Sequence, residues 1–432
     1  RYSFDMLGEA AMTRSDAQRY FDAYAQAIDS IGASHQGDDV FAAPSISVKL
    51  SALHPRYEFV RRRAVVEELG DMLLALAKKA KAHNIALTMD AEEADRLELS
   101  LDIFERVYRA PALAGYHGLG LAVQAYQKRA TSVIQWLGEL ARGGARRIPV
   151  RLVKGAYWDT EIKHAQELGL TGYPVFTRKV NTDVSYLACA RLILDAGDAL
   201  YGQFATHNAH TLAYVLQHAG GRDDYEFQRL HGMGEELYGA VVDADRYNRP
   251  CRVYAPVGSH EDLLPYLVRR LLENGANTSF VNRIVDAEAP IEDIIADPID
   301  AVRALESIPH PNIVAPADLY GAQRKNSQGI NLADRDVAQR LLAGLADAAD
   351  KRYDVGPLLD SKTVSGEQTA SVSPFDTREV VGTVRFADAQ TTQHAIDVAV
   401  QAWPSWRATP AAVRAGALRR AADLFEAEAE EL

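Results

Sequence analysis

The chain has 432 residues with a net charge of −12 at pH 7, and 47% of them are apolar and 25% charged. This is an ordinary composition for a globular protein with substantial cores, and the dispersed basic residues argue against a nucleic-acid partner. Two isolated cysteines, Cys189 and Cys251, are too few for a disulfide framework or a zinc site, which fits the reducing cytoplasm. No apolar run approaches the roughly 18 residues of a membrane-spanning helix.

Short apolar runs alternate with longer helical patterns from residue 45 onward, as expected for repeated strand–helix units with a parallel sheet. Strands are expected at 45–53, 85–90, 118–126, 150–158, 201–208, 225–232 and 252–258, with an eighth at 277–281. Eight such units match the size of a closed strand–helix barrel. We therefore predict an α/β fold with a distorted, TIM-like (βα)8 barrel over residues 41–285, and an open doubly wound sheet is the alternative.

The residues before and after the predicted barrel differ from it in composition and in their apolar pattern. Residues 1–40 are expected to form an N-terminal helical segment. Residues 286–360 are rich in Pro, Asp and Asn without sustained alternation, which indicates an extended linker. Residues 361–432 predict a hairpin followed by two helices, the start of a second α/β unit. Because the chain begins without Met and in mid-pattern, we expect it to be part of a longer protein.

Polar residues stand where the predicted barrel strands end, the place at which such barrels meet their ligands. They are Asp90, Gln124, Arg151, Lys154, Thr206, His207, Gln228 and Tyr254. One such residue alone is more often a satisfied structural group, but eight on one rim indicate a site. Lys49 shares a strand face with Ser47 and Ser51, so it is predicted to face the barrel interior or its mouth.

The segment RLVKGAYW, residues 151–158, suits a polyanion. Arg151 and Lys154 supply positive charge, and Gly155 lets backbone amides approach closely. Tyr157 and Trp158 could cover a flat ring system, with core packing as the competing interpretation. The stretch FTRK, residues 176–179, adds two more cations. Together these residues favour a cofactor that carries a phosphate or pyrophosphate and a flat ring.

A second pair of cations lies in YLVRRLLENGA, residues 266–276, which predicts an amphipathic helix. A polar stripe of this kind is usually solvated surface. However, an arginine fork binds a carboxylate through two parallel hydrogen bonds and keeps its charge. We therefore expect Arg269 and Arg270 to hold a small carboxylate.

Other classes of function remain open from the residues alone. No metal site is predicted, because His207 and His210 have a spacing that a metal could use but no evident third ligand. A lyase or aldolase without such a cofactor could use Lys49 or Lys154 as a Schiff-base amine. The chain could also be a scaffold module of a larger assembly, and the cofactor content of the purified protein would distinguish both from a cofactor-dependent enzyme.

Several motifs resemble the proline dehydrogenase domain of the bacterial proline utilization A flavoenzymes. They are SISVKLSALHPRYE, LTMDAEEADRLELSLDIFE, VRLVKGAYWDTEIKHAQELGL, GYPVFTRKVNTDVSYLACARLIL, FATHNAH, EFQRLHGMGEELY and RVYAPVGSHEDLLPYLVRRLLENGANTSFVNR. The resemblance runs from about residue 1 to residue 285, the linker resembles that of the same proteins, and residues from about 361 resemble the start of an aldehyde dehydrogenase.

The resemblance implies a barrel that holds non-covalent FAD and oxidises L-proline to 1-pyrroline-5-carboxylate by hydride transfer from C5. Electrons would leave to a membrane quinone, and the longer parent would also oxidise glutamate semialdehyde with NAD. The parent would be a cytoplasmic homo-oligomer that meets the inner membrane as a peripheral protein, and this segment would bind no nucleic acid.

Matching motifs also assign residues to the site. Catalysis is implied for Lys49, Asp90, Tyr254, Arg269 and Arg270, and Leu230 and Tyr266 complete the implied substrate pocket. FAD contacts are implied for Asp90, Gln124, Arg151, Val153, Lys154, Gly155, Ala156, Tyr157, Trp158, Phe176, Thr177, Arg178, Lys179, Thr206, His207, Asn208, Gln228, Glu273, Ser279 and Phe280. No metal ligand is implied.

Overall fold

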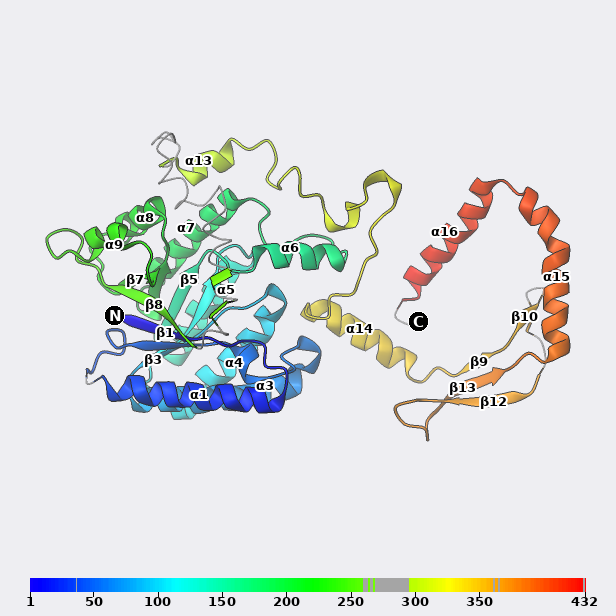
Figure 1. Cartoon of the computed structure of the whole chain (residues 1–432), viewed down its shortest axis with the longest axis horizontal. Coiled ribbons are helices and arrows are strands. Elements are labelled where there is room, and N and C mark those ends of the chain that lie inside the picture. The colour runs from blue at the N-terminus through cyan, green and yellow to red at the C-terminus, as the bar shows by residue number, and fades with distance from the viewer. Residues whose placement is uncertain are drawn as a thin grey trace. The chain divides into compact units, whose positions relative to one another are not determined.

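The chain forms two compact units, Arg1–Asp334 and Arg335–Leu432, and each is described by itself (Figure 1). The computed structural model describes residues 1–35, 37–258, 263–264, 267–268, 295–359, 362–363, 366–429 and 432. The linker predicted at 286–360 is divided between the units, because its described residues up to Asp334 belong with the barrel.

The first unit is a closed barrel of eight parallel strands that follow one another in chain order. The strands are β1 (Tyr2–Met6), β2 (Ser45–Val48), β3 (Ala86–Met89), β4 (Leu119–Gln124), β5 (Ile148–Val153), β6 (Leu200–Ala205), β7 (Tyr225–Leu230) and β8 (Cys251–Val257). All seven strands predicted between residues 45 and 258 overlap an observed strand. The prediction of a TIM-like barrel is therefore confirmed, and the open sheet is wrong.

The first strand of the barrel was missed in the sequence. β1 pairs with both β2 and β8 and so closes the barrel, although residues 1–40 were predicted to be helical and outside it. The short stretch YSFDM alternates, with Ser3 and Asp5 buried, which is the period of a strand. Residues 277–281, where the eighth strand was predicted, lie outside the described residues, and the barrel closes without them.

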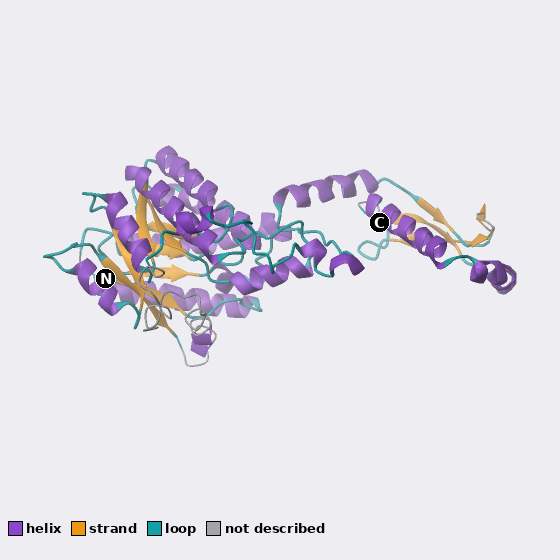
Figure 2. Ribbon diagram, turned by 90° about the horizontal axis from the view of Figure 1, so that it is seen from above, coloured by secondary structure: helices purple, strands orange, loops and turns teal. Residues whose placement is uncertain are grey.

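Helices surround the strands on the outside (Figure 2). They are α1 (Arg14–Ala33), α2 (Leu50–Leu53), α3 (Arg62–Ala82), α4 (Leu97–Tyr108), α5 (Ala130–Gly144), α6 (Trp158–Glu167), α7 (Lys179–Asp195), α8 (Ala209–Ala219), α9 (Glu235–Val242) and α13 (Pro298–Arg303). The main core includes Ile46 and Val48 of β2 and Leu69 and Leu73 of α3, all fully buried. None of the described helices is long and apolar enough to cross a membrane.

The inside of the barrel is polar, whereas such barrels are usually filled with branched aliphatic side chains. Arg252 Nε donates to Glu226 Oε1 at 2.6 Å, and Gln228 Nε2 donates to the same oxygen at 3.0 Å. Gln228 Oε1 in turn accepts from Arg151 Nε at 2.8 Å. Arg151 also reaches across to Ser47 Oγ at 2.8 Å and Ser3 Oγ at 3.0 Å. These hydrogen-bonded polar side chains form a continuous network inside the barrel that extends towards the carboxyl ends of the strands.

The second unit contains α14 (Arg335–Ala348), β9 (Tyr353–Val355), β10 (Leu358–Leu359), β11 (Lys362–Thr363), β12 (Gln368–Val372), β13 (Val380–Arg385), α15 (Ala389–Ala408) and α16 (Ala411–Ala427). β12 and β13 form the predicted antiparallel hairpin, and β9 adds to it in parallel. Within the described part of this unit, Ala338 is the one buried apolar side chain, while Trp403 and Phe425 are exposed. These residues alone do not enclose a core.

Candidate active site

Charged side chains from four strands meet at the mouth of the barrel. Lys49 Nζ lies 2.7 Å from Asp5 Oδ1 and 3.5 Å from Asp90 Oδ2. Arg151 donates to Asp90 Oδ1 at 2.7 Å, and the Tyr254 hydroxyl donates to Asp90 Oδ2 at 3.1 Å. The structure thus brings together Lys49, Asp90, Arg151 and Tyr254, which the sequence had predicted for the site, and adds Asp5, which it had not.

Backbone bonds hold the two residues that follow β2 and β3. Lys49 is the N-cap of α2 with extended backbone, and its N–H donates to the buried Tyr24 hydroxyl at 3.2 Å. The Asp90 N–H donates to Val48 O at 2.9 Å, which continues the pairing of β3 with β2. The strand predicted at 45–53 therefore ends at Val48, and Lys49 turns into the mouth where the chain starts a helix.

Burial and neighbouring charges shift the pKa values in this cluster. Burial works to lower the pKa of Lys49, but Tyr254, Asp5 and Asp90 outweigh it and hold the pKa well above its ordinary value. Burial, Asp5 and Asp90 together raise the pKa of the Tyr254 hydroxyl. Burial and the nearby Asp90 carboxylate raise the pKa of Asp5, against the pull of Lys49. Lys49 and Tyr254 therefore keep their protons at neutral pH.

The cluster is close to electrically balanced, with Lys49 and Arg151 facing Asp5 and Asp90. An added carboxylate in such a buried place needs further positive charge to offset its desolvation. The residues predicted to supply it, Arg269 and Arg270 with Tyr266 beside them, lie outside the described residues, as do Glu273, Ser279 and Phe280.

The loop after β5 makes a close turn beside a tyrosine ring. Gly155 has φ +151°, and a Cβ built on it would lie 2.3 Å from the ring of Tyr126, so only glycine fits there. The Gln124 side chain holds this loop to its neighbour: its Oε1 accepts from Ala156 N at 3.0 Å, and its Nε2 donates to Glu92 O at 2.8 Å. The predicted polyanion loop is thus tightly positioned.

Positive charge gathers next to this loop. Lys154 and Lys179 both bind the carboxylate of Asp183, the latter at 2.9 Å. One carboxylate thus faces two positive side chains, which leaves one positive charge for a ligand. Trp158 donates from Nε1 to Phe176 O at 2.8 Å and is 37% exposed. This bond ties the start of α6 to the FTRK segment, so the two stretches predicted to bind the cofactor lie next to each other.

The residues predicted after β6 have structural partners of their own. Asn208 caps α8 by accepting from Thr211 N at 3.0 Å, and Thr206 Oγ1 accepts from Asn208 N at 3.1 Å. His207 Nε2 accepts from the N–H of Leu230 at 3.2 Å, which links the ends of β6 and β7. They lie on the same rim, and their bonds fix the shape of its edge.

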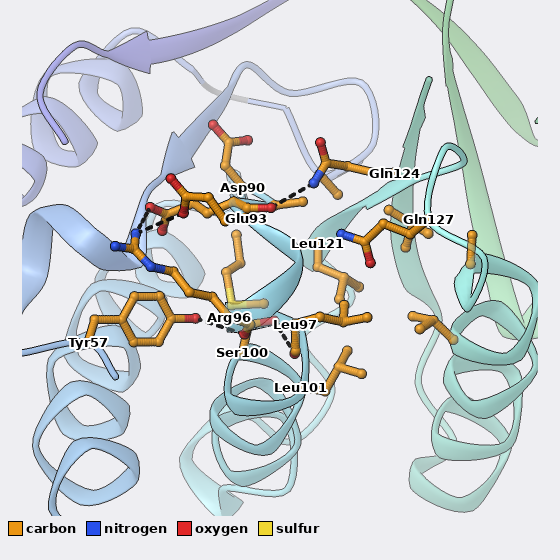
Figure 3. A pocket seen from close by; sticks show the side chains of 17 residues that line it. Tyr57, Asp90, Glu93, Arg96, Leu97, Ser100, Leu101, Leu121, Gln124 and Gln127 are labelled. Carbon is orange, nitrogen blue, oxygen red and sulfur yellow. Dashed lines mark hydrogen bonds and ion pairs between the residues drawn. The ribbon is translucent and has the colours of Figure 1, made fainter. Parts of the chain in front are cut away.

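A cavity beside Asp90 lies behind the barrel wall, between β3, β4 and α4 (Figure 3). Its volume of about 20 Å³ has room for about one water molecule. Arg96 closes it through ion pairs with Glu92 at 2.8 Å and Glu93 at 3.2 Å. At this volume it has no room for an amino acid or a flavin.

Comparison with known proteins identifies the family. The family model for proline dehydrogenase matches residues 1–283. The chain belongs to the proline dehydrogenase family. A second model, for the aldehyde dehydrogenase family, matches residues 359–432, which lie within the second unit. Both matches agree with the resemblances seen in the sequence.

The relatives named PutA are longer than this proline dehydrogenase family member. The bifunctional protein PutA of Escherichia coli (strain K12) is 50% identical over 445 residues, which cover 100% of this chain and 34% of that protein. PutA of Rhizobium meliloti is 46% identical over 432 residues, covering 99% of this chain and 35% of that protein. The chain thus spans about a third of the length of these relatives. Proline dehydrogenase 1 of Bacillus subtilis (strain 168) is 28% identical over 284 residues, covering 65% of this chain and 80% of that protein.

Solved structures show the same similarity. A proline utilization A variant from Bradyrhizobium japonicum has a TM-score of 0.87 at 47% identity, covering 100% of this chain and 41% of that one. Proline utilization A from Bdellovibrio bacteriovorus, inactivated by N-propargylglycine, has a TM-score of 0.90 at 26% identity, covering 100% of this chain and 45% of that one.

Proposed function

We propose that this chain is an FAD-dependent proline dehydrogenase that oxidises L-proline to 1-pyrroline-5-carboxylate. The observation that carries the proposal is the buried cluster of Lys49, Asp5, Asp90 and Arg151 at the barrel mouth, in a chain whose residues 1–283 match the proline dehydrogenase family. Relatives similar to this part of the chain are named proline dehydrogenase or bifunctional PutA.

The residues present fit FAD. The glycine turn at Gly155, whose space a Cβ would fill, and the surplus of positive charge around Asp183 suit a pyrophosphate. The partly exposed ring of Trp158 suits a flat ring system. FAD would be held by Val153 to Trp158 and Thr177 to Lys179, with Gln124, Thr206, His207, Asn208 and Gln228 around them. When bound, FAD supplies the two-electron acceptor for the hydride that leaves C5 of proline.

The chain's own side chains would bind and orient the substrate. Oxidation of proline removes a hydride from C5 and a proton from the ring nitrogen, and a C=N bond forms between C5 and that nitrogen. Because Lys49 stays protonated, its positive charge disfavours a second cation beside it and so favours the neutral amine. Tyr254 is fixed by its bond to Asp90 and by the Arg151 guanidinium, which lies 4.9 Å from its ring centre. It would form one wall of the pocket.

Arg269 and Arg270 would hold the substrate carboxylate, with Leu230 and Tyr266 lining the pocket. The near balance of charge in the described cluster supports this assignment, because the carboxylate needs cations from elsewhere. Holding the ring at both ends would align C5 with the acceptor, which is the main contribution that orientation makes to such a reaction.

The remaining steps belong to the longer protein. Electrons would pass on to a membrane quinone, from a cytoplasmic homo-oligomer that meets the inner membrane at its surface. The match of residues 359–432 to aldehyde dehydrogenases supports a parent that also oxidises glutamate semialdehyde with NAD.

A lysine-based lyase receives little support from the same geometry. Lys49 is held protonated by its carboxylate neighbours, and a protonated amine cannot attack a carbonyl. Burial lowers the pKa of Lys154 although Asp183 opposes the shift, but its Nζ is bonded to that carboxylate. Neither lysine is presented as a free amine.

Product formation tests the proposal. With an artificial electron acceptor and L-proline, the protein should reduce the acceptor and release 1-pyrroline-5-carboxylate, which a colour-forming amine reagent can trap. D-Proline is the matched control. Acceptor reduction that does not depend on L-proline, or no reduction after FAD is added, would contradict it and leave the scaffold hypothesis.

A further inference from the structure

The linker that follows the barrel is bonded to the loop that leads into α7 and to the first turn of that helix. Three consecutive linker residues each make one hydrogen bond there: His310 N donates to Thr177 Oγ1 at 3.0 Å, Arg178 Nε donates to Pro309 O at 3.1 Å, and Asn181 Nδ2 donates to Ile308 O at 3.0 Å. Thr177 and Asn181 are buried. The contacts involve backbone groups of the linker, so they fix its path as well as that of the loop.

A second attachment lies a few residues further along. The Tyr173 hydroxyl donates to Val314 O at 2.7 Å. The side chain of Ile313 packs on a small apolar cluster that includes Tyr126, Tyr173 and Val175, the last fully buried. Tyr126 is the ring that confines Gly155. Through Ile313 the linker therefore supports both loops that carry the predicted FAD contacts.

In a third attachment, linker residues 326–329 pack closely against residues 166–169. Gly329 N donates to Leu168 O at 2.6 Å, and Asn326 Nδ2 donates to Gln166 O at 2.7 Å. A Cβ at Gly169 would lie 1.9 Å from Ser327 O, so a side chain at Gly169 would collide with the linker backbone. A spacer that only connects two domains does not require such contacts.

We propose that linker residues 308–314, through their backbone groups and the Ile313 side chain, brace the segments 153–158 and 173–181 from outside the cofactor site and so set the affinity for FAD. The inference rests on the proposed function, which makes FAD the ligand of these loops. Loops that are held in place before the ligand arrives lose less conformational freedom when it binds, and affinity rises accordingly.

Ile313→Ala tests the brace, and Ile308→Ala is the matched control. Both shorten an isoleucine of the same linker segment, but the Ile308 side chain is 55% exposed and its carbonyl bond to Asn181 stays. Truncating a packed isoleucine loosens its site, so Ile313→Ala should weaken FAD binding by about tenfold in a titration of the apoprotein, and Ile308→Ala should not. At saturating FAD, kcat and KM for L-proline should match wild type, which separates bracing from a role in the reaction.

Two further measurements keep the test decisive. Hydrogen exchange in the apoprotein should become faster at loop 173–181 in Ile313→Ala alone, for example at the Phe176 N–H that donates to Tyr126 O at 2.8 Å. If Ile313→Ala lowers the thermal stability of the whole barrel, Tyr173→Phe should still weaken FAD binding severalfold, because it removes the hydroxyl that donates to Val314 O and accepts from Gln166 Nε2. Wild-type FAD affinity in both variants would overturn the inference and leave the proposed function standing. Wild-type protein that binds no FAD would overturn the proposed function itself.

Discussion

Replacing Lys49 by methionine removes a cation that two buried carboxylates share. Its Nζ lies 2.7 Å from Asp5 and 3.5 Å from Asp90, and the side chains of Lys49 and Asp5 are 9% and 3% exposed. Asp90 keeps the 2.7 Å bond from Arg151. The substitution therefore acts mainly on Asp5, because this carboxylate loses its ion-pair partner while it stays buried.

The size of the effect depends on pH. Removing one partner of a buried pair costs about 3–5 kcal/mol. The variant can avoid a buried lone charge by protonating Asp5, which from an ordinary pKa of about 3.9 costs at most about 4 kcal/mol at pH 7 and about 1.5 kcal/mol at pH 5. The folded variant then binds a proton that the unfolded chain does not, so its stability rises as pH falls. Relative to wild type, the loss in free energy of unfolding should therefore shrink from about 4 kcal/mol at pH 7 to about 1.5 kcal/mol at pH 5.

Urea unfolding of the apoprotein at pH 7 and pH 5 measures this deficit. Lys79→Met is the control, since Lys79 pairs with Asp29 at 2.6 Å on the surface, where both side chains are well exposed. Such pairs contribute little, so its effect should be small and alike at both pH values. If Lys49→Met were as mild as this control at pH 7, or lost more stability at pH 5 than at pH 7, the reasoning about the buried cluster would be refuted.

Three other outcomes are expected. Arg270→Met should lower kcat/KM for L-proline by roughly 10-fold to 100-fold while FAD content is kept, because a substrate carboxylate loses a charged donor. Unchanged kinetics would instead indicate that Arg270 is a solvated side chain with no role in binding. Gly155→Ala should reduce bound FAD after purification, because its Cβ would lie 2.3 Å from the Tyr126 ring; full occupancy would contradict this. These 432 residues alone should form no NADH from glutamate semialdehyde, because Cys189 and Cys251 both lie in the barrel unit and cannot serve as the thiol of the second unit; measurable NADH would disprove it.

Much of the fold could be predicted because each strand–helix unit leaves its own periodic pattern. Seven strands were found this way. β1 was missed because it is a five-residue strand with two buried polar side chains, Ser3 and Asp5, and an apolar pattern cannot reveal it. Its partner β8 begins at Cys251, far along the chain, so the pairing that makes it a strand is not a local property.

The site could be predicted in part for a related reason. Strand ends point to one rim, so Asp90, Arg151 and Tyr254 could be placed together from the sequence. Asp5 could not, since its strand was missed. The attachment of the linker to Thr177 was also beyond reach, because it depends on backbone bonds such as that from His310 N, which composition does not encode. The roles assigned to Arg269 and Arg270 stay predictions, because those residues lie outside the described part of the chain.

Anaerobic addition of L-proline to the purified protein tests the central claim most directly. The protein should carry visible flavin absorbance that falls as L-proline is added and stays unchanged with D-proline, because only the L-isomer can present C5 to the acceptor while its carboxylate is held. A colourless protein that takes up no added FAD, or flavin colour that L-proline does not bleach, would contradict the account.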